Sequence, residues 1–494
     1  MSTSPRFARP AVLAPVLALG LACSGAGAVP SRSAWLQEQL RRDNAAWLSR
    51  DPELVAVKLE RMAADPYDFM RGTAGIYYND LQRVDLDEDP LAPLFGFEAL
   101  AMLFGDAHPE NLGTGWPGAA EVGAAPPVPG ALAVEFFDPD AITFGPVGFE
   151  LKRAAVGLGA LGLGGGCGAP CQRRAAAALG RGWAAGVSGA RWGDGAGGPS
   201  ALLLGLQDDA AVAAATLELR LEDVAWEAPP VEADAPAAGW RLRRAPLDEA
   251  GRGARGLDAE ELAQVRRLAP AIERRFGLQL VDAVRRFGSG VSSIPALRYL
   301  LLLDRGGGTV EELVVLDLRE LVDPPVLPVG GPLVAGVFED GAERVERGAQ
   351  SLWADPDADP FLMGLMDGDQ AFRLRGWRGA FDALDHVQIT EALREGGLTE
   401  LDLEALAFDE GLLLGGAHAR APGPDGAPRQ GALAAALRSA GGAEGLARRL
   451  SLGVEADLDR LEGDHALLRA LIEQEGPLAG IDAPGGLGDP TMVY

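Results

Sequence analysis

Residues 105–111 read Gly-Asp-Ala-His-Pro-Glu-Asn, and the interpretation of the chain starts from them. Asp106 is followed five positions later by Asn111, and a second aspartate, Asp138, follows an apolar run. Enzymes that transfer the terminal phosphoryl group of a nucleotide use one carboxylate to orient the acceptor hydroxyl. They use an asparagine and a second carboxylate to hold Mg²⁺. The three residues have the types and the order for those roles, although any one of them alone is typical of a polar turn.

The composition is that of a large globular protein. The 494 residues are 48% hydrophobic and 23% charged, so the chain can bury a core without a cysteine framework. The formal net charge is −27. Because a nucleic-acid backbone is bound by clustered Lys and Arg, and no basic stripe is visible, we expect no nucleic-acid partner.

The first 28 residues are expected to be an export leader rather than part of the fold. Two arginines precede an apolar run from Ala11 to Ala22, which is too short to span a bilayer comfortably. Ala26-Gly27-Ala28 fits the cleavage site of a soluble exported protein, whereas Leu21-Ala22-Cys23-Ser24 resembles a lipoprotein signal. Both alternatives stay open. Either one predicts a protein of the periplasm or outer envelope, with membrane contact only through a lipid anchor on Cys23.

The other two cysteines, Cys167 and Cys171, lie four positions apart. In an oxidising compartment such a pair can close a small disulfide. A structural zinc site needs four ligands, and the sequence has no second cysteine pair. We therefore expect a disulfide that links two helices, with a redox role as the alternative.

Apolar spacing and turn residues predict the secondary structure. Helices are expected over Ala34–Leu48, Pro52–Ala64, Glu150–Leu163 and Leu257–Phe287, and over most of 335–471; strands are expected over Leu100–Leu103 and Ala131–Phe137. His418, on one of the later helices, is expected to be a satisfied core histidine rather than a catalytic base.

A glycine loop and a β-hairpin are predicted in the middle of the chain. Gly288-Ser289-Gly290 leads into the apolar residues 297–303, and a polar turn joins these to a second strand at 312–319. A glycine pair before a strand is common in ordinary turns. Glycine loops over a hairpin are also how kinase-like enzymes bring backbone N–H groups close to phosphates.

These stretches together resemble a bacterial family, that of domain of unknown function 2252, which is grouped with protein-kinase-like and aminoglycoside-phosphotransferase-like folds. The matching segments are Arg61–Met62, Asp65–Thr73, Gly105–Asn111, Asp138–Asp140, Gly145–Pro146, Leu151–Arg153, Gly288–Gly290, Arg298–Tyr299 and Ala417–Arg420. The resemblance covers roughly residues 55 to 470.

By this resemblance Asp106 is the catalytic aspartate. Asn111 and Asp138 are metal ligands, and Asp140 supports the metal. The residues implied to bind the cofactor phosphates are Gly288, Ser289, Gly290, Arg319, Arg71 and Lys152, the last two being candidates for phosphate binding or for ion pairs that hold the site together.

Three departures from the family pattern bear on catalysis. The second hairpin strand ends in Arg319-Glu320, where the family has a Lys-Glu pair, and arginine binds phosphate with a different geometry. Ser292-Ser293 stands where a further glycine is expected, and Glu150 replaces an aspartate. The glycine hairpin also follows the catalytic loop in the chain, which is the reverse of the order in ordinary kinases.

The resulting prediction is an α+β, protein-kinase-like fold with a helix-rich main lobe and a small β-hairpin lobe, in permuted order. It forms one domain over residues 29–490, with a catalytic-loop part at about 55–200, a glycine-hairpin part at about 257–330 and a helical part at about 335–475.

Three hypotheses for the function follow. The first is an exported phosphotransferase that uses ATP and Mg²⁺ to phosphorylate a hydroxyl of a small molecule or protein. The second is an inactive pseudokinase that binds or scaffolds partners at the cell envelope. The third treats Asp106, Asp138 and Asp140 as a metal site without nucleotide, for example for Ca²⁺.

Overall fold

The fold is described from a computed structural model. It covers residues 30–83, 85–115, 132–192, 199–215, 225–228, 239–246, 252–288, 290–307, 312–324, 337–377 and 382–483. The expected leader with Cys23, and Ser289 of the glycine loop, lie outside the described residues. Within these ranges, no helix combines the length and the apolar character needed to cross a membrane.

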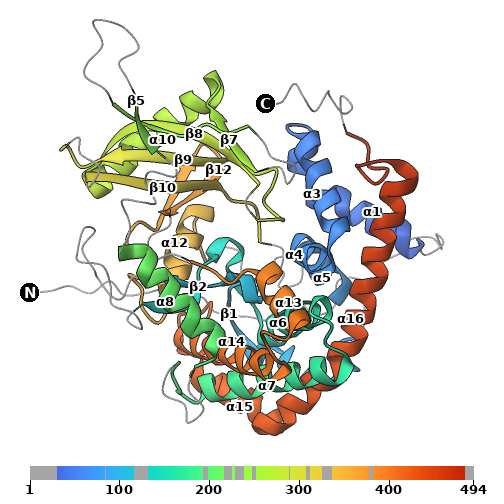
Figure 1. The fold of residues 1–494 in the computed structure, drawn as a ribbon. Coiled ribbons are helices and arrows are strands. Elements are labelled where there is room, and N and C mark those ends of the chain that lie inside the picture. The colour runs from blue at the N-terminus through green and yellow to red at the C-terminus, as the bar shows by residue number, and fades with distance from the viewer. Residues whose placement is uncertain are drawn as a thin grey trace, which may run out of the picture.

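A six-stranded antiparallel sheet and a larger group of helices make up an α+β fold (Figure 1). The helices are α1 Arg32–Asp43, α2 Ala45–Leu48, α3 Pro52–Ala64, α4 Pro66–Gly72, α5 Ala74–Leu81, α6 Val147–Gly164, α7 Ala169–Val187, α8 Ala201–Ala215, α10 Ala259–Phe276, α12 Gly341–Leu352, α13 His386–Glu395, α14 Glu400–Arg420, α15 Gln430–Ser439 and α16 Gly442–Glu475. The strands are β1 Leu100–Leu103, β2 Leu112–Gly115, β3 Ala133–Phe136, β4 Thr143–Pro146, β5 Ala225–Ala228, β6 Gly239–Leu242, β7 Gly253–Gly256, β8 Gln279–Phe287, β9 Arg298–Asp304, β10 Leu313–Glu320, β11 Met363–Asp367 and β12 Gln370–Gly376.

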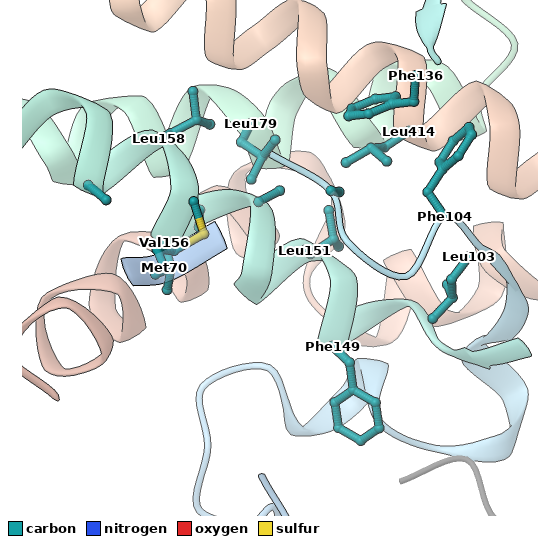
Figure 2. Packing of buried hydrophobic residues seen from close by; sticks show 14 of the residues in the cluster. Met70, Leu103, Phe104, Phe136, Phe149, Leu151, Val156, Leu158, Leu179 and Leu414 are labelled. Atoms are coloured by element: carbon teal, nitrogen blue, oxygen red, sulfur yellow. The ribbon is translucent and has the colours of Figure 1, made fainter. Parts of the chain in front are cut away.

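Helix α6 is the centre of the helical part, and it is buried along nearly its whole length. Figure 2 shows Leu151, Val156 and Leu158 of this helix among side chains from neighbouring elements. Helices α7 and α14 pack unusually closely beside it, because a Cβ on Gly182 or Gly415 would overlap the backbone of the facing helix. The short strands β1 to β4 pack against this core.

The sheet has the strand order β11-β12-β10-β9-β8-β7. The predicted hairpin is confirmed as β9 and β10, and it forms the middle of this larger sheet. One face, which includes Tyr299 and Leu301, packs on Val265 and Leu268 of α10. The opposite face carries Asp317, Arg319 and Arg373. Here Arg319 and Arg373 form ion pairs with Asp138 of the helical part.

Two parts of the sheet differ from the sequence prediction. The helix predicted to run to Phe287 ends at Phe276, because Gly277 adopts a left-handed φ of 67° and terminates α10. Residues 279–287 form β8, so the helix prediction was wrong there. Strands β11 and β12 lie within the region expected to be mostly helical. A two-residue turn with Gly368 at φ 62° joins them.

The disulfide between Cys167 and Cys171 agrees with the prediction. It connects the loop after α6 to the first turn of α7, with the two Cα atoms 5.8 Å apart. Asp65 starts α4, because its side chain accepts hydrogen bonds from the backbone N–H groups of Tyr67 and Asp68.

Candidate functional site

The loop that carries Asp106 leaves the end of β1, which pairs with β4. Gly105 has a φ of 83°, and an added Cβ would overlap the backbone oxygen of Ala141, so only glycine fits there. Oε1 of Glu150 accepts a hydrogen bond from the Gly105 N–H at 2.6 Å, and Oε2 accepts one from the Phe104 N–H at 3.3 Å. Helix α6 therefore fixes the backbone directly before Asp106.

Glu150 is itself held by His418, and both side chains are fully buried. Nδ1 of His418 accepts a hydrogen bond from Nε1 of Trp183 at 3.0 Å. Because an indole nitrogen is only a donor, the histidine proton is on Nε2, which donates to Glu150 at 2.7 Å. His418 is thus the satisfied core histidine that the sequence predicted. Nearby, burial and the charge of Glu150 raise the pKa of Glu410 well above its ordinary value.

Arg153 holds one oxygen of Asp106. Its Nε and Nη2 lie 2.9 and 2.7 Å from Oδ1, and Nη2 also donates to the backbone oxygen of Met70. Oδ2 of Asp106 lies 3.8 Å from Nε2 of His108. Burial lowers the pKa of His108 to about 4, so this histidine is neutral at pH 7 and forms no ion pair with Asp106.

Asn111 is oriented by the same loop. Its Nδ2 donates to the backbone oxygen of Asp106 at 2.8 Å, and its backbone oxygen accepts a hydrogen bond from the Phe137 N–H at 2.9 Å. Strands β2 and β3 pair directly beside this contact, with Leu112 opposite Phe136. The hairpin therefore brings Asp138 close to Asn111 in the fold, as the catalytic-loop hypothesis requires.

Asp138 and Asp140 are bound by two arginines of the sheet. Oδ1 of Asp138 lies 2.6 Å from Nη2 of Arg319 and 2.8 Å from Nη1 of Arg373. Asp140 forms ion pairs with the same two arginines through its two different oxygens. Burial acts to raise the pKa of Asp138, but Arg319 and Arg373 outweigh it and hold this pKa well below its usual range.

The same end of the sheet carries two further arginines. Arg298 forms a buried ion pair with Asp317 at 2.6 Å. Arg375 donates to the backbone oxygen of Phe137 at 3.0 Å, and burial together with the charge of Arg373 lowers its pKa to about 10. Arg373 and Arg375 were not predicted as site residues from the sequence. The alternation of arginines with apolar residues through 371–375, after a tight turn, is the signal that could have identified them.

Ser293, three residues after Gly290, lies beside Arg319, because Nη1 of Arg319 donates to its Oγ at 3.4 Å. Gly288 and Gly290 both have a φ of 74°. Arg319 therefore connects Ser293, which follows the glycine loop, to Asp138 and Asp140, although these residues are far apart in the chain.

The other two predicted phosphate ligands are engaged in ion pairs. Arg71 pairs with Glu110 and with Asp68. Lys152 lies 2.8 Å from Asp89 and 2.7 Å from Asp457, next to α16. The second of the two predicted roles, an ion pair that holds the structure together, fits both residues.

Glu110 also connects the catalytic loop to α13. It accepts hydrogen bonds from the backbone N–H of His386 at 3.0 Å and from Nδ1 of its ring at 2.7 Å. Glu110, Asp385 and His386 have ligand atoms within 4.8 Å of one another. However, Glu110 is already bonded to Arg71, and Asp385 caps α13, so these groups act as structural partners in this arrangement.

Three oxygens remain available for a ligand. Among the described residues, Oδ2 of Asp106, Oδ1 of Asn111 and Oδ2 of Asp138 accept no hydrogen bond, while the other polar atom of each side chain is fixed. Carboxylate and amide oxygens are the ligands that Mg²⁺ prefers. Asn111 and Asp138 therefore fit one such ion, whereas both oxygens of Asp140 are taken by arginines.

Residues 50–189 match one bacterial family. Its description is "Uncharacterized protein conserved in bacteria (DUF2252)", and the matched span includes Asp106, Asn111, Asp138 and Lys152. No curated protein and no solved structure matches the chain.

Proposed function

We propose that the protein is a kinase-like phosphotransferase that moves the terminal phosphoryl group of ATP to a hydroxyl of a small molecule or protein. One observation carries the proposal. Asp106, Asn111 and Asp138 are each fixed through one polar atom and keep one oxygen without a partner among the described residues. Side chains that are fixed through one atom and offer the other to solvent can bind a ligand with little reorganisation.

Asp106 has the role of orienting the acceptor hydroxyl. Arg153 holds Oδ1 with two hydrogen bonds and so orients the carboxylate, which leaves Oδ2 to accept the hydroxyl proton of the acceptor. The neutral ring of His108 lies next to this oxygen and adds no competing ion pair at pH 7.

Oδ1 of Asn111 and Oδ2 of Asp138 would hold Mg²⁺, which supplies positive charge to the transferring phosphoryl group when it is bound. Gly288, Gly290 and Arg319 are the proposed contacts for the remaining phosphates. In this interpretation the sheet corresponds to the small lobe of a kinase-like fold and follows the catalytic loop in the chain, which gives the permuted order.

A second candidate function, a pseudokinase that binds partners without transferring phosphate, is favoured by the arginines on Asp138 and Asp140. Two guanidinium groups within hydrogen-bond distance of these carboxylates oppose a divalent cation at the same place. For both candidates we propose export through the leader, with Cys23 as the lipid anchor if one is present. A Cys23→Ser variant that stays in the membrane fraction would contradict the anchor.

Turnover is the measurement that tests the proposed function. ATP and Mg²⁺ are incubated with the full chain, with and without mixtures of hydroxyl acceptors, and release or transfer of the γ-phosphate is followed. Asp106→Asn should reduce the rate by roughly 10²- to 10⁴-fold, since it removes the general base. Asp459→Asn, on the exposed side of α16, is the matched control and should leave the rate unchanged. Nucleotide binding without any turnover would favour the second candidate instead.

A further inference from the structure

Four arginines lie on one face of the sheet, at the end that meets the helical part. Arg319 of β10 is directly opposite Arg298 on β9 and Arg373 on β12, and Arg375 is opposite Asp317. Directly opposed residues and residues two positions apart share one face of a sheet, so these side chains form a continuous cluster. We call Arg298, Arg319, Arg373 and Arg375 the arginine cluster.

The arginine cluster neutralises the carboxylates that face it, and holds the pKa values of Asp138 and Asp317 below their usual range. Within 4.0 Å, its four guanidinium groups form ion pairs with three carboxylates of the described residues, those of Asp138, Asp140 and Asp317. The carboxylate of Asp359 also interacts electrostatically with Arg375 and Arg373, and it accepts hydrogen bonds from the backbone N–H groups of Phe361 and Gly376.

The cluster has one partly exposed end. The side chains of Arg375 and Asp138 are 26% and 33% exposed, whereas that of Arg373 is 1% exposed. The buried members neutralise the carboxylates, and Arg375 is the member that solvent reaches. An anion that approaches this end meets Arg375 first, with Asp138 already paired to two guanidinium groups behind it.

We propose that the arginine cluster binds the phosphates of a nucleoside di- or triphosphate without a divalent cation. In most phosphotransferase sites the metal ion screens the phosphates from the aspartates that hold it. Here Arg319 and Arg373 already provide that screening. Nη1 of Arg375 is bonded to the Phe137 oxygen, and its Nη2, which has no partner among the described residues, can donate to a phosphate. The inference deepens the proposed function: binding is independent of metal, whereas transfer uses the ion that Asn111 and Asp138 would hold.

Calorimetric titration of the full chain with ADP and ATP, in EDTA and in excess Mg²⁺, tests this proposal. The dissociation constants in the two buffers should agree within about threefold, and they should rise with salt because the contact is electrostatic. Arg375→Met should weaken binding about tenfold in both buffers, because it removes one charged hydrogen-bonding group. Arg267→Met is the matched control, since Arg267 is an exposed arginine of α10 that pairs with Asp367. Arg375→Lys, which keeps the charge, separates lost binding from lost folding when melting is followed in parallel.

Three other results of the titrations would each contradict part of the proposal. Binding that requires Mg²⁺ overturns the inference and leaves the proposed function standing. Absence of binding in both buffers overturns both. Pyrophosphate that binds as tightly as ADP would contradict recognition of a nucleotide, because the phosphates alone would then account for the affinity.

Discussion

Nε2 of His418 lies 2.7 Å from Oε2 of Glu150, and no part of either side chain reaches solvent. This contact joins α14 to α6, and through Glu150 it reaches the N–H groups of Phe104 and Gly105. The buried carboxylate of Glu150 accepts three hydrogen bonds. If it is removed, all three donors lose their acceptor inside the protein, where water cannot replace it. The contact therefore supports the loop of Asp106 from a distance.

Glu150→Ala should reduce the free energy of unfolding by about 3 kcal/mol, because it leaves His418 and two backbone N–H groups without an acceptor in the core. Urea unfolding at neutral pH measures the change. Glu444→Ala, at an exposed ion pair with Arg181, is the control and should leave the midpoint unchanged. An equal effect of both substitutions would mean that the buried contact contributes no more to the free energy of unfolding than an exposed ion pair does.

Gly105→Ala should destabilise the protein more than Gly166→Ala does. Both glycines have a left-handed φ, 83° and 81°, so both substitutions carry the same backbone cost of about 1 kcal/mol. Only the Cβ at Gly105 overlaps another atom, the oxygen of Ala141, while the one at Gly166 has no heavy atom within 4 Å. The difference in unfolding free energy should be at least about 2 kcal/mol, as expected for a steric clash in a packed region.

Melting curves of the two alanine variants give this comparison directly. A smaller difference than that would show that the backbone at Ala141 moves to make room, and that the position of the Asp106 loop is less strictly determined.

The parts of the site that the sequence predicted are close together in the chain. Asp106 and Asn111 share one loop, and the pairing of β2 with β3 brings Asp138 beside them. Residue types and spacing were therefore sufficient to predict that these three residues lie close together. The glycine loop and Arg319 were found for the same reason, because β8, the loop, β9 and β10 follow one another.

The partners of these residues could not be predicted in the same way. Arg373 is 235 positions from Asp138, and the two meet only because β12 pairs with β10 in a particular register. A one-residue change of that register would turn Arg373 to the opposite face of the sheet. The register between β10 and β12 cannot be read from the local spacing of residues. For this reason Asp140 was predicted to support a metal and not to pair with arginines.

The error at β8 has a similar physical cause. Leu280, Val284 and Phe287 are four and three positions apart, which matches one face of a helix. In the structure the region is a strand, because Gly277 ends α10 and the segment pairs with β9 and β7. Tertiary pairing here outweighs a local pattern that fits both structures.

Asp106→Ala should cost stability as well as activity. Arg153 is almost fully buried, and Asp106 is the carboxylate with which it is paired. Removing one member of such a pair leaves an uncompensated charge, and we expect a loss of about 3 kcal/mol or more in the free energy of unfolding. Asp106→Asn keeps an oxygen for Arg153 and should cost clearly less.

Chemical denaturation of the two variants distinguishes these effects. If both variants were as stable as the unaltered protein, the ion pair between Arg153 and Asp106 would contribute little to the fold. The loss of activity in either variant could then be assigned to the chemistry alone.

Glu135 should make the stability of the protein fall as the pH rises from about 5 to 7. Burial raises the pKa of this β3 carboxyl from 4.5 to about 7, although Arg420 and the N–H of Ala354 act in the opposite direction. Between those values the folded state holds a proton that the unfolded state has lost, so the free energy of unfolding decreases with pH, by at most about 1.4 kcal/mol per unit. The stabilisation is complete below pH 4.5 and is lost as the pH passes through 7.

Glu135→Gln keeps an acceptor for the Ala354 N–H and removes the titration, so its unfolding free energy should vary less with pH over this range. Urea unfolding at pH 5, 6 and 7 measures the slope for both proteins. Glu391→Gln, on the exposed side of α13, should keep the slope of the unaltered chain. The variant will retain part of the decline, because burial also raises the pKa of Asp359 to about 6. Equal slopes for all three proteins would mean that Glu135 is ionised in the folded state throughout, and that water or a nearby charge compensates its burial.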